Sequence, residues 1–396
     1  MTVSHRRLAV FLLVILALVA AWRWPRDRPA PPAADAAGAA QAPPSEASGW
    51  QHLLQEVFPG LDLLRVGRDS RKCEADIKAV TRQRWEALGR SDRRDHRIAH
   101  ALLADAYGGM PGKSAQLLSD LLVADPGNAE LLWFHATACH PEHGCDAREA
   151  AQRLVDAEPR NLAHWLRLIE TATRHEPGKD KWIAGPENKD ELAGLLHQAA
   201  KAGTHYASHW GDAFTLAYMG MEDLPVPTSC NSAALQAAGK AMTKMGVHGL
   251  DAPMDSTGIA INASTAAMIH APTHNVLGEL CKPEDATTTA RIQACRDVAS
   301  ALSEGDTLLA RGVGLSLMRK LGDGMPAREA DAMRERYRQH RWMLDKSVEL
   351  AMDFDSARIL TMMTEGEVSA IQAELARRGK WPPPSDWRPN DGTKGP

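Results

Sequence analysis

The chain has 396 residues, with 50 acidic against 46 basic side chains and a formal net charge of −4. An acidic balance without a basic stripe excludes the charge pattern of a nucleic-acid-binding protein. The length allows one long helical array or two domains.

Residues 1–24 have the layout of an export signal. Arg6 and Arg7 precede an uncharged apolar run from Leu8 to Trp22, as in a signal peptide. The run is shorter than the about 20 residues of a full membrane span. Trp24, just after it, instead favours a retained helix, because tryptophan concentrates at membrane interfaces. We expect a signal peptide or signal anchor, a periplasmic location, and attachment to the inner membrane if the segment is retained.

Residues 25–48 are mostly alanine and proline and have no periodic apolar face. Such a stretch cannot bury enough surface to fold, and its prolines favour an extended chain. It is predicted to be a linker, which either holds the body off a membrane or remains after cleavage.

The rest of the chain is predicted to be all-α, built from antiparallel helical hairpins. Leucine and alanine recur at helical spacing, and alternating β-branched runs are absent. The expected helices are Asp76–Leu88, Ile98–Tyr107, Ser114–Ala124, Ala129–Cys139, Asp146–Ala157, Leu162–Arg174, Lys189–Ala202, Ser208–Tyr218, Ser232–Met245, Thr288–Leu302, Thr307–Leu321, Ala327–Met352 and Glu365–Gly379.

Two helix starts have local signals. Asp306 follows Gly305 and is expected to cap the next helix, because glycine suits a helix stop and aspartate a helix start. Thr364 and Glu367 have the spacing of a capping box for the last helix.

A four-residue turn recurs between helices. Asp125-Pro126-Gly127-Asn128 returns as Glu158-Pro159-Arg160-Asn161, 33 residues later. Proline is tolerated at a turn, and asparagine caps a helix start. The period and the acid-Pro-x-Asn joint resemble tetratricopeptide-like repeats over about residues 95–175.

This resemblance implies a helical solenoid over residues 49–202 with a concave face that binds a partner. A tryptophan on such a face would be an interface anchor. In this register the residues that face the concave side are Glu130, Trp133, Thr137, Ala163, Leu166 and Glu170.

The later chain has a weaker pattern. Residues 203–285 are rich in small residues, with glycines and prolines that break any period, so we expect an irregular helical and loop region. Residues 286–380 are expected to form a C-terminal helical region, and residues 381–396 a disordered tail.

The six cysteines are expected to form disulfides, because an exported chain folds in an oxidising compartment. Cys139 ends one helix and Cys145 begins the next, so their Cβ atoms can come within the ~4 Å that a bridge needs. The expected pairs are Cys139–Cys145 and Cys281–Cys295, which leaves Cys73 and Cys230 to pair across the molecule or stay free.

No metal site and no cofactor are predicted. Cys139, His140, His143 and Cys145 crowd into seven residues stiffened by Pro141, which is a poor spacing for tetrahedral zinc. Histidine and methionine pairs are the basis of an alternative, a periplasmic copper- or zinc-handling protein. These pairs are His96/His100, His205/His209, His270/His274, Met242/Met245 and Met362/Met363.

The predicted function is partner binding without catalysis. Nucleophile elbows and phosphate loops are absent from the sequence. We expect an exported helical-repeat protein that binds a protein or peptide in the cell envelope. A second alternative is a helical chaperone or inhibitor of a secreted enzyme, since the layout is similar to lipase-specific foldases. The foldase pattern Arg-x-x-Phe-Asp-Tyr is not met, because Ser356 follows Phe354-Asp355.

Overall fold

A computed structural model of the chain describes residues 62–175, 182–183, 189–244, 253–265, 274–282, 288–322, 326–351 and 356–389. The chain divides into two units, Met1–Val57 and Phe58–Pro396, and every described residue belongs to the second. The predicted export signal and linker lie outside the described residues. Of the helices that the structure describes, none is both long and apolar enough to cross a bilayer.

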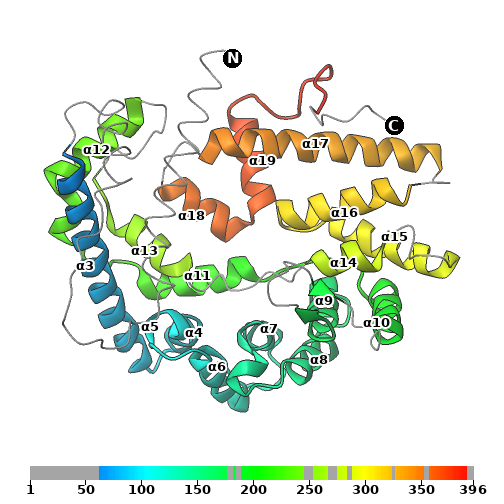
Figure 1. Ribbon diagram of the computed structural model, residues 1–396, viewed down its shortest axis with the longest axis horizontal. Helices are drawn as coiled ribbons and strands as arrows, with labels where there is room; N and C mark the ends of the chain where they lie inside the picture. Colours follow the sequence, from blue (N-terminus) through cyan, green and yellow to red (C-terminus); the bar gives the residue numbers. More distant parts are fainter. Residues whose placement is uncertain are drawn as a thin grey trace, which may run out of the picture. The chain divides into compact units, whose positions relative to one another are not determined.

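The described part of the second unit is built almost entirely of α-helices, which confirms the predicted all-α class (Figure 1). Its first helices are α3 (Leu63–Gly89), α4 (Arg94–Leu102), α5 (Ala104–Tyr107), α6 (Lys113–Ala124), α7 (Ala129–Ala138), α8 (Ala147–Ala157), α9 (Leu162–Thr171) and α10 (Lys189–Ala202). The later helices are α11 (Trp210–Met221), α12 (Ala233–Lys244), α13 (Ser256–Ser264), α14 (Asn275–Leu280), α15 (Thr289–Ser303), α16 (Leu308–Lys320), α17 (Ala327–Ala351), α18 (Ser356–Glu365) and α19 (Glu367–Arg377).

Short elements complete the described part. Two 3₁₀ turns, η1 (Pro141–His143) and η3 (Thr228–Asn231), lie between helices. The strands β1 (Arg174–His175) and β2 (Trp182–Ile183) pair antiparallel within the segment between α9 and α10.

Both recurring turns end one helix and start the next, as their sequence predicts. Asn128 is the N-cap of α7, where its side-chain oxygen accepts a hydrogen bond from the Leu131 amide at 2.9 Å. Asn161 is the N-cap of α9, and its oxygen accepts from the Ala163 amide at 3.1 Å. Each asparagine therefore satisfies one of the amides that a helix start leaves unpaired.

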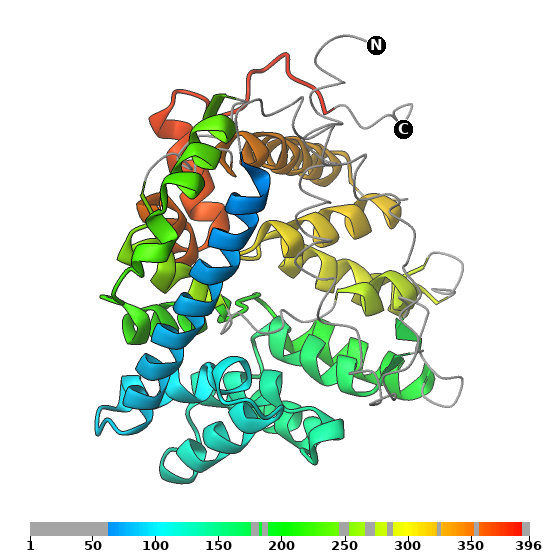
Figure 2. The ribbon, with the colours of Figure 1, turned by 60° about the vertical axis from the view of Figure 1, so that its left-hand side comes forward.

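Successive helices pack side by side from α6 to α10 (Figure 1). α10 contacts α15, α15 contacts α16, and α16 contacts α17. α11 packs against α4, α13 and α18, and the blue α3 lies beside the green α12 (Figure 2). The described residues of the predicted regions 49–202, 203–285 and 286–380 thus contact one another within the second unit.

The segment 203–209, between α10 and α11, crosses the N-terminal end of α9. The Leu162 amide donates to the His205 carbonyl at 2.7 Å, and the Thr204 amide donates to the Arg160 carbonyl at 2.9 Å. The Asn161 side chain accepts from the Ala207 amide at 3.1 Å and donates to the Ala207 carbonyl at 3.0 Å. One buried asparagine therefore caps α9 and holds this segment against it.

The same segment is bonded to the C-terminal part of the chain. Both the amide and the hydroxyl of Ser208 donate to one carboxylate oxygen of Asp306, each at 3.1 Å. The cap of α16 is Thr307, whose hydroxyl accepts from the Ala310 amide at 3.1 Å. The prediction that Asp306 caps this helix is therefore wrong: a partner distant in sequence takes its carboxylate.

The expected capping box at the last helix is also wrong. Thr364 lies inside α18, where its hydroxyl donates to the Leu360 carbonyl at 2.9 Å. Gly366 is the N-cap of α19, and the Glu367 carboxylate accepts from the Leu308 amide of α16 at 2.8 Å. Glu367 thus links α19 to α16 instead of capping the start of its own helix.

Part of the predicted disordered tail is ordered. Residues 381–389 lie within the described part, and the Trp387 ring packs edge-on to Trp342 with centroids 5.1 Å apart. The Trp342 indole nitrogen donates to the Lys380 carbonyl at 2.8 Å. These contacts extend the smaller core cluster around α17 and α19. Residues 390–396 lie outside the described residues.

Three disulfides join the six cysteines. The Cys139–Cys145 and Cys281–Cys295 bridges confirm the predicted pairs. Cys73 on α3 pairs with Cys230 in η3, across a sequence separation of 157. The sequence leaves open whether Cys73 and Cys230 pair or stay free, and in the structure they pair.

The three bridges should differ in the stability that they supply. The chain-entropy argument gives about 5 kcal/mol for the separation of 157, about 3 for 14 and about 2 for 6. Paired Cys→Ala variants, compared by chemical denaturation, should therefore lose stability in that order. A larger loss without Cys139–Cys145 than without Cys73–Cys230 would contradict this account.

Candidate functional site

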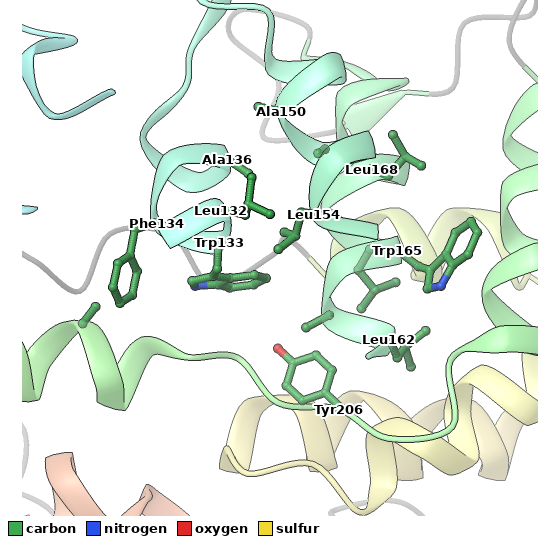
Figure 3. Close-up of a cluster of buried hydrophobic side chains, with 14 of the residues drawn as sticks. Leu132, Trp133, Phe134, Ala136, Ala150, Leu154, Leu162, Trp165, Leu168 and Tyr206 are labelled. Atoms are coloured by element: carbon green, nitrogen blue, oxygen red, sulfur yellow. The ribbon is translucent and has the colours of Figure 1, made fainter. Parts of the chain in front are cut away.

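The residues predicted to line a concave binding face lie mostly in the core. Ala163 and Leu166 are fully buried, Trp133 is 2% exposed, and Thr137 is also buried. Figure 3 shows Trp133 of α7 pointing toward Leu154 of α8 within the core. The expectation that these side chains face solvent is corrected: they pack the helices against one another.

Glu170 has a structural partner as well. Arg167 donates to its carboxylate at 2.6 Å, and two further guanidinium nitrogens of Arg167 donate to the Ala136 carbonyl of α7. Buried charges persist when they are paired and hydrogen-bonded in this way. Of the predicted face, only Glu130 stays half-buried and accessible.

A polar cluster lies next to Glu130. Glu158, His164 and His209, which we call the His–Glu centre, each offer one ligand atom, and these atoms lie within 4.8 Å of one another. One Glu158 oxygen is 3.7 Å from the Nε2 atom of each histidine. The imidazole rings are stacked with centroids 5.6 Å apart.

Three elements meet to form this centre. Glu158 is the C-cap of α8 and the first residue of the second recurring turn, and His164 lies in the first turn of α9, just after it. His209 precedes α11 at the end of the segment 203–209 and has a left-handed backbone, with φ of 51°. A residue other than glycine holds this conformation only where its surroundings fix it.

Asn161 determines which nitrogen of His164 faces the centre. Its oxygen accepts from the Ala163 and Ala207 amides, so its amide nitrogen is the atom that faces the histidines. That nitrogen lies 3.1 Å from His164 Nε2 and 3.4 Å from His209 Nε2. Because an amide nitrogen only donates, His164 Nε2 is an unprotonated acceptor whose lone pair is directed at the Asn161 amide.

A carboxylate orients the second histidine from behind. His209 Nδ1 donates to Asp212, in the first turn of α11, at 3.0 Å. This hydrogen bond places the other ring nitrogen, Nε2, toward Glu158 and Asn161. The Trp133 ring packs against both imidazoles, with centroid distances of 5.5 and 5.7 Å.

Burial and charge separate the two histidines. Burial, together with the charge of His209, lowers the pKa of His164 to about 3, so this ring is neutral near pH 7. Burial alone would lower the pKa of His209 too, but the Asp212 hydrogen bond and the charges of Asp212, Glu158 and Glu130 raise it above its ordinary value. Burial and the nearby Asp212 charge raise the pKa of Glu130.

The centre is closed on one side and open on the other. The His164 side chain is fully buried and that of His209 is 18% exposed, whereas those of Glu158 and Asp212 are 42% and 58% exposed. A cation from solvent would therefore meet carboxylates first and imidazole nitrogens behind them.

The histidine pairs expected from sequence do not form this centre. His96 Nδ1 bonds to the Ser91 hydroxyl, and His100 stacks on Trp85. His205 is exposed and contributes its backbone, while His209 joins His164 instead. His270 and Met245, and the side chain of Met363, lie outside the described residues.

Sequence reasoning missed the pairing of His164 with His209. The only local signal is the recurring turn, which places Glu158 and Asn161 beside His164. A second cluster, His135 with Cys139 and Cys145, also has ligand atoms within 4.8 Å, but its sulfur atoms form a disulfide.

Comparison with known proteins finds no matching family model, no similar curated protein and no similar solved structure.

Two buried histidines away from the centre should make stability depend on pH. Burial lowers the pKa of His274 to about 4, and burial with the Arg341 and Arg311 charges lowers that of His340 to about 4. Between about 6.5 and 4 the unfolded chain binds protons that the folded chain does not, so the free energy of unfolding should fall on acidification. Each histidine contributes up to about 1.4 kcal/mol per pH unit.

The measurement is urea denaturation between pH 4 and 7. His340→Gln should flatten the pH dependence, whereas His205→Gln, at an exposed position, should leave it unchanged. Equal slopes for the wild type and His340→Gln would contradict the argument.

Proposed function

We propose that the chain is an exported, non-enzymatic helical-repeat protein that binds a protein or peptide partner in the cell envelope. The observation that supports export most directly is the pairing of all six cysteines in disulfides. Disulfides persist in oxidising compartments and are uncommon in the cytosol. The apolar run between Leu8 and Trp22 would direct the chain there, as a cleaved signal or as an inner-membrane tether.

A tetratricopeptide-like arrangement of α6 to α9 is part of this proposal. The consecutive packing of these helices and the two asparagine-capped joints support it. Repeat arrays expose extended surfaces on which a partner can bind. Because most of the predicted face is packed in the core, the partner would meet Glu130 together with the exposed carboxylates of Glu158 and Asp212.

Export is tested by the compartment that the chain reaches and by the state of its thiols. An alkaline phosphatase fusion after residue 61 should be active, and the exported chain should show no thiol reactive to maleimide after denaturation without reductant. The same chain lacking residues 1–24 should stay in the cytosol with reactive thiols. An inactive fusion, or free thiols in the full chain, would contradict the export proposal.

Partner contact is tested by a photo-crosslinking residue placed at Glu130, with the exposed Leu64 as a matched position on α3. A discrete envelope adduct should form from position 130 and not from position 64. The same adducts from both positions would contradict the proposal that the partner binds at Glu130.

A second candidate, the metal-handling protein, is supported by one specific observation. Within the described part of the chain, the His–Glu centre gathers two imidazoles and a carboxylate without a competing disulfide.

A further inference from the structure

We propose that Glu158, His164 and His209 bind a divalent transition-metal ion, with zinc as the reference ion. The inference deepens the metal-handling candidate and does not depend on partner binding. Two imidazole nitrogens and one carboxylate oxygen form a ligand set that suits zinc and its neighbours in the first row.

Two of the three distances between the ligand atoms are close to what the ion requires. Bonds of 2.0–2.1 Å at tetrahedral angles place neighbouring ligand atoms about 3.4 Å apart. The Glu158 oxygen lies 3.7 Å from each histidine Nε2 atom. The ligand atoms of the two histidines lie within 4.8 Å of each other, so the imidazoles as well as the exposed carboxylate would move to complete the site.

The correct atoms face inward. His164 Nε2 is unprotonated, because it accepts from the Asn161 amide, and a bound ion would replace that hydrogen bond. His209 donates its other ring nitrogen to Asp212, and a carboxylate behind a ligating histidine is the usual outer partner in metal sites. The Asn161 amide nitrogen, within 3.4 Å of both Nε2 atoms, lies where a positive group is favoured.

The negative charge around the His–Glu centre also favours a bound cation. The Glu158 oxygen lies 3.7 Å from His209 Nε2 and the Asp212 oxygen 3.0 Å from its Nδ1, so two carboxylates at the centre attract a cation. Three protein ligands leave a coordination position for water or for a donor atom of a bound partner. The exposure of Glu158 and Asp212 gives the ion a path from solvent.

The rival explanation is a purely structural cluster, in which protonated His209 bridges the carboxylates and no metal binds. Zinc binding separates the two explanations. The disulfide-bonded full-length chain, stripped with a chelator, is titrated with zinc against a chromophoric competitor. We expect one equivalent per chain, and cobalt in its place should show the visible spectrum of a tetrahedral nitrogen and oxygen site.

Variants assign the ion to these residues. Asp212→Asn, which alters only the outer carboxylate, should weaken zinc binding 10- to 100-fold. Glu158→Gln and His209→Gln, which remove a ligand, should weaken it further. His205→Gln, on the same segment, is the matched control and should bind like the wild type. Thermal melting of each apo variant shows whether it is folded.

Either of two results would overturn the proposal. The first is no stoichiometric zinc binding by the oxidised wild-type chain. The second is binding that Glu158→Gln and His209→Gln leave unchanged, or that requires reduction of Cys139–Cys145, since the ion would then lie elsewhere. Neither result would alter the thiol or crosslinking measurements, so this proposal can fail while export and partner binding stand.

Discussion

The Asn161 side chain holds together the start of α9 and the segment 203–209, which form most of the His–Glu centre. It is fully buried, caps α9 through the Ala163 amide, and exchanges two hydrogen bonds with the backbone of Ala207. A buried amide without these partners would be costly, because each unpaired polar group loses its water without compensation. The helix start and the segment 203–209 are therefore fixed by the same group, and neither can move alone.

The consequences of this constraint reach from the end of α8 to the start of α16. Because the segment is fixed, Ser208 meets Asp306 before α16, and His209 meets His164 and Glu158 at the end of α8. Disulfides act on the surrounding helices, and Cys73–Cys230 joins α3 to η3 across 157 positions. Disulfides stabilise the helical scaffold, and hydrogen bonds stabilise the His–Glu centre. A rigid frame of this kind suits a site in which ligands are held ready for an ion.

The sequence predicts well those features whose causes lie within a few residues. The caps at Asn128 and Asn161 and the Cys139–Cys145 bridge depend on neighbours along the chain, and the structure confirms them. Asp306 and Glu367 have equally good local signals, but distant amides take their carboxylates.

The candidate site was harder to predict for the same reason. A helical period shows which residues share a face, but it does not show what covers that face. The sequence therefore predicts that Trp133 is an exposed anchor, whereas other helices bury it. Asn161 and His209 lie 48 positions apart, and no spacing rule joins them.

The most direct test is hydrogen exchange on Asn161→Ala beside Asn128→Ala. Both changes remove a helix N-cap, which costs about 0.5–2 kcal/mol, but only Asn161 also holds the segment 203–209. Amides of Thr204, Ala207 and Ser208 should exchange much faster in Asn161→Ala and at the wild-type rate in Asn128→Ala. Equal protection of these amides in both variants would show that the segment is held by something else, and the central role of Asn161 would be wrong.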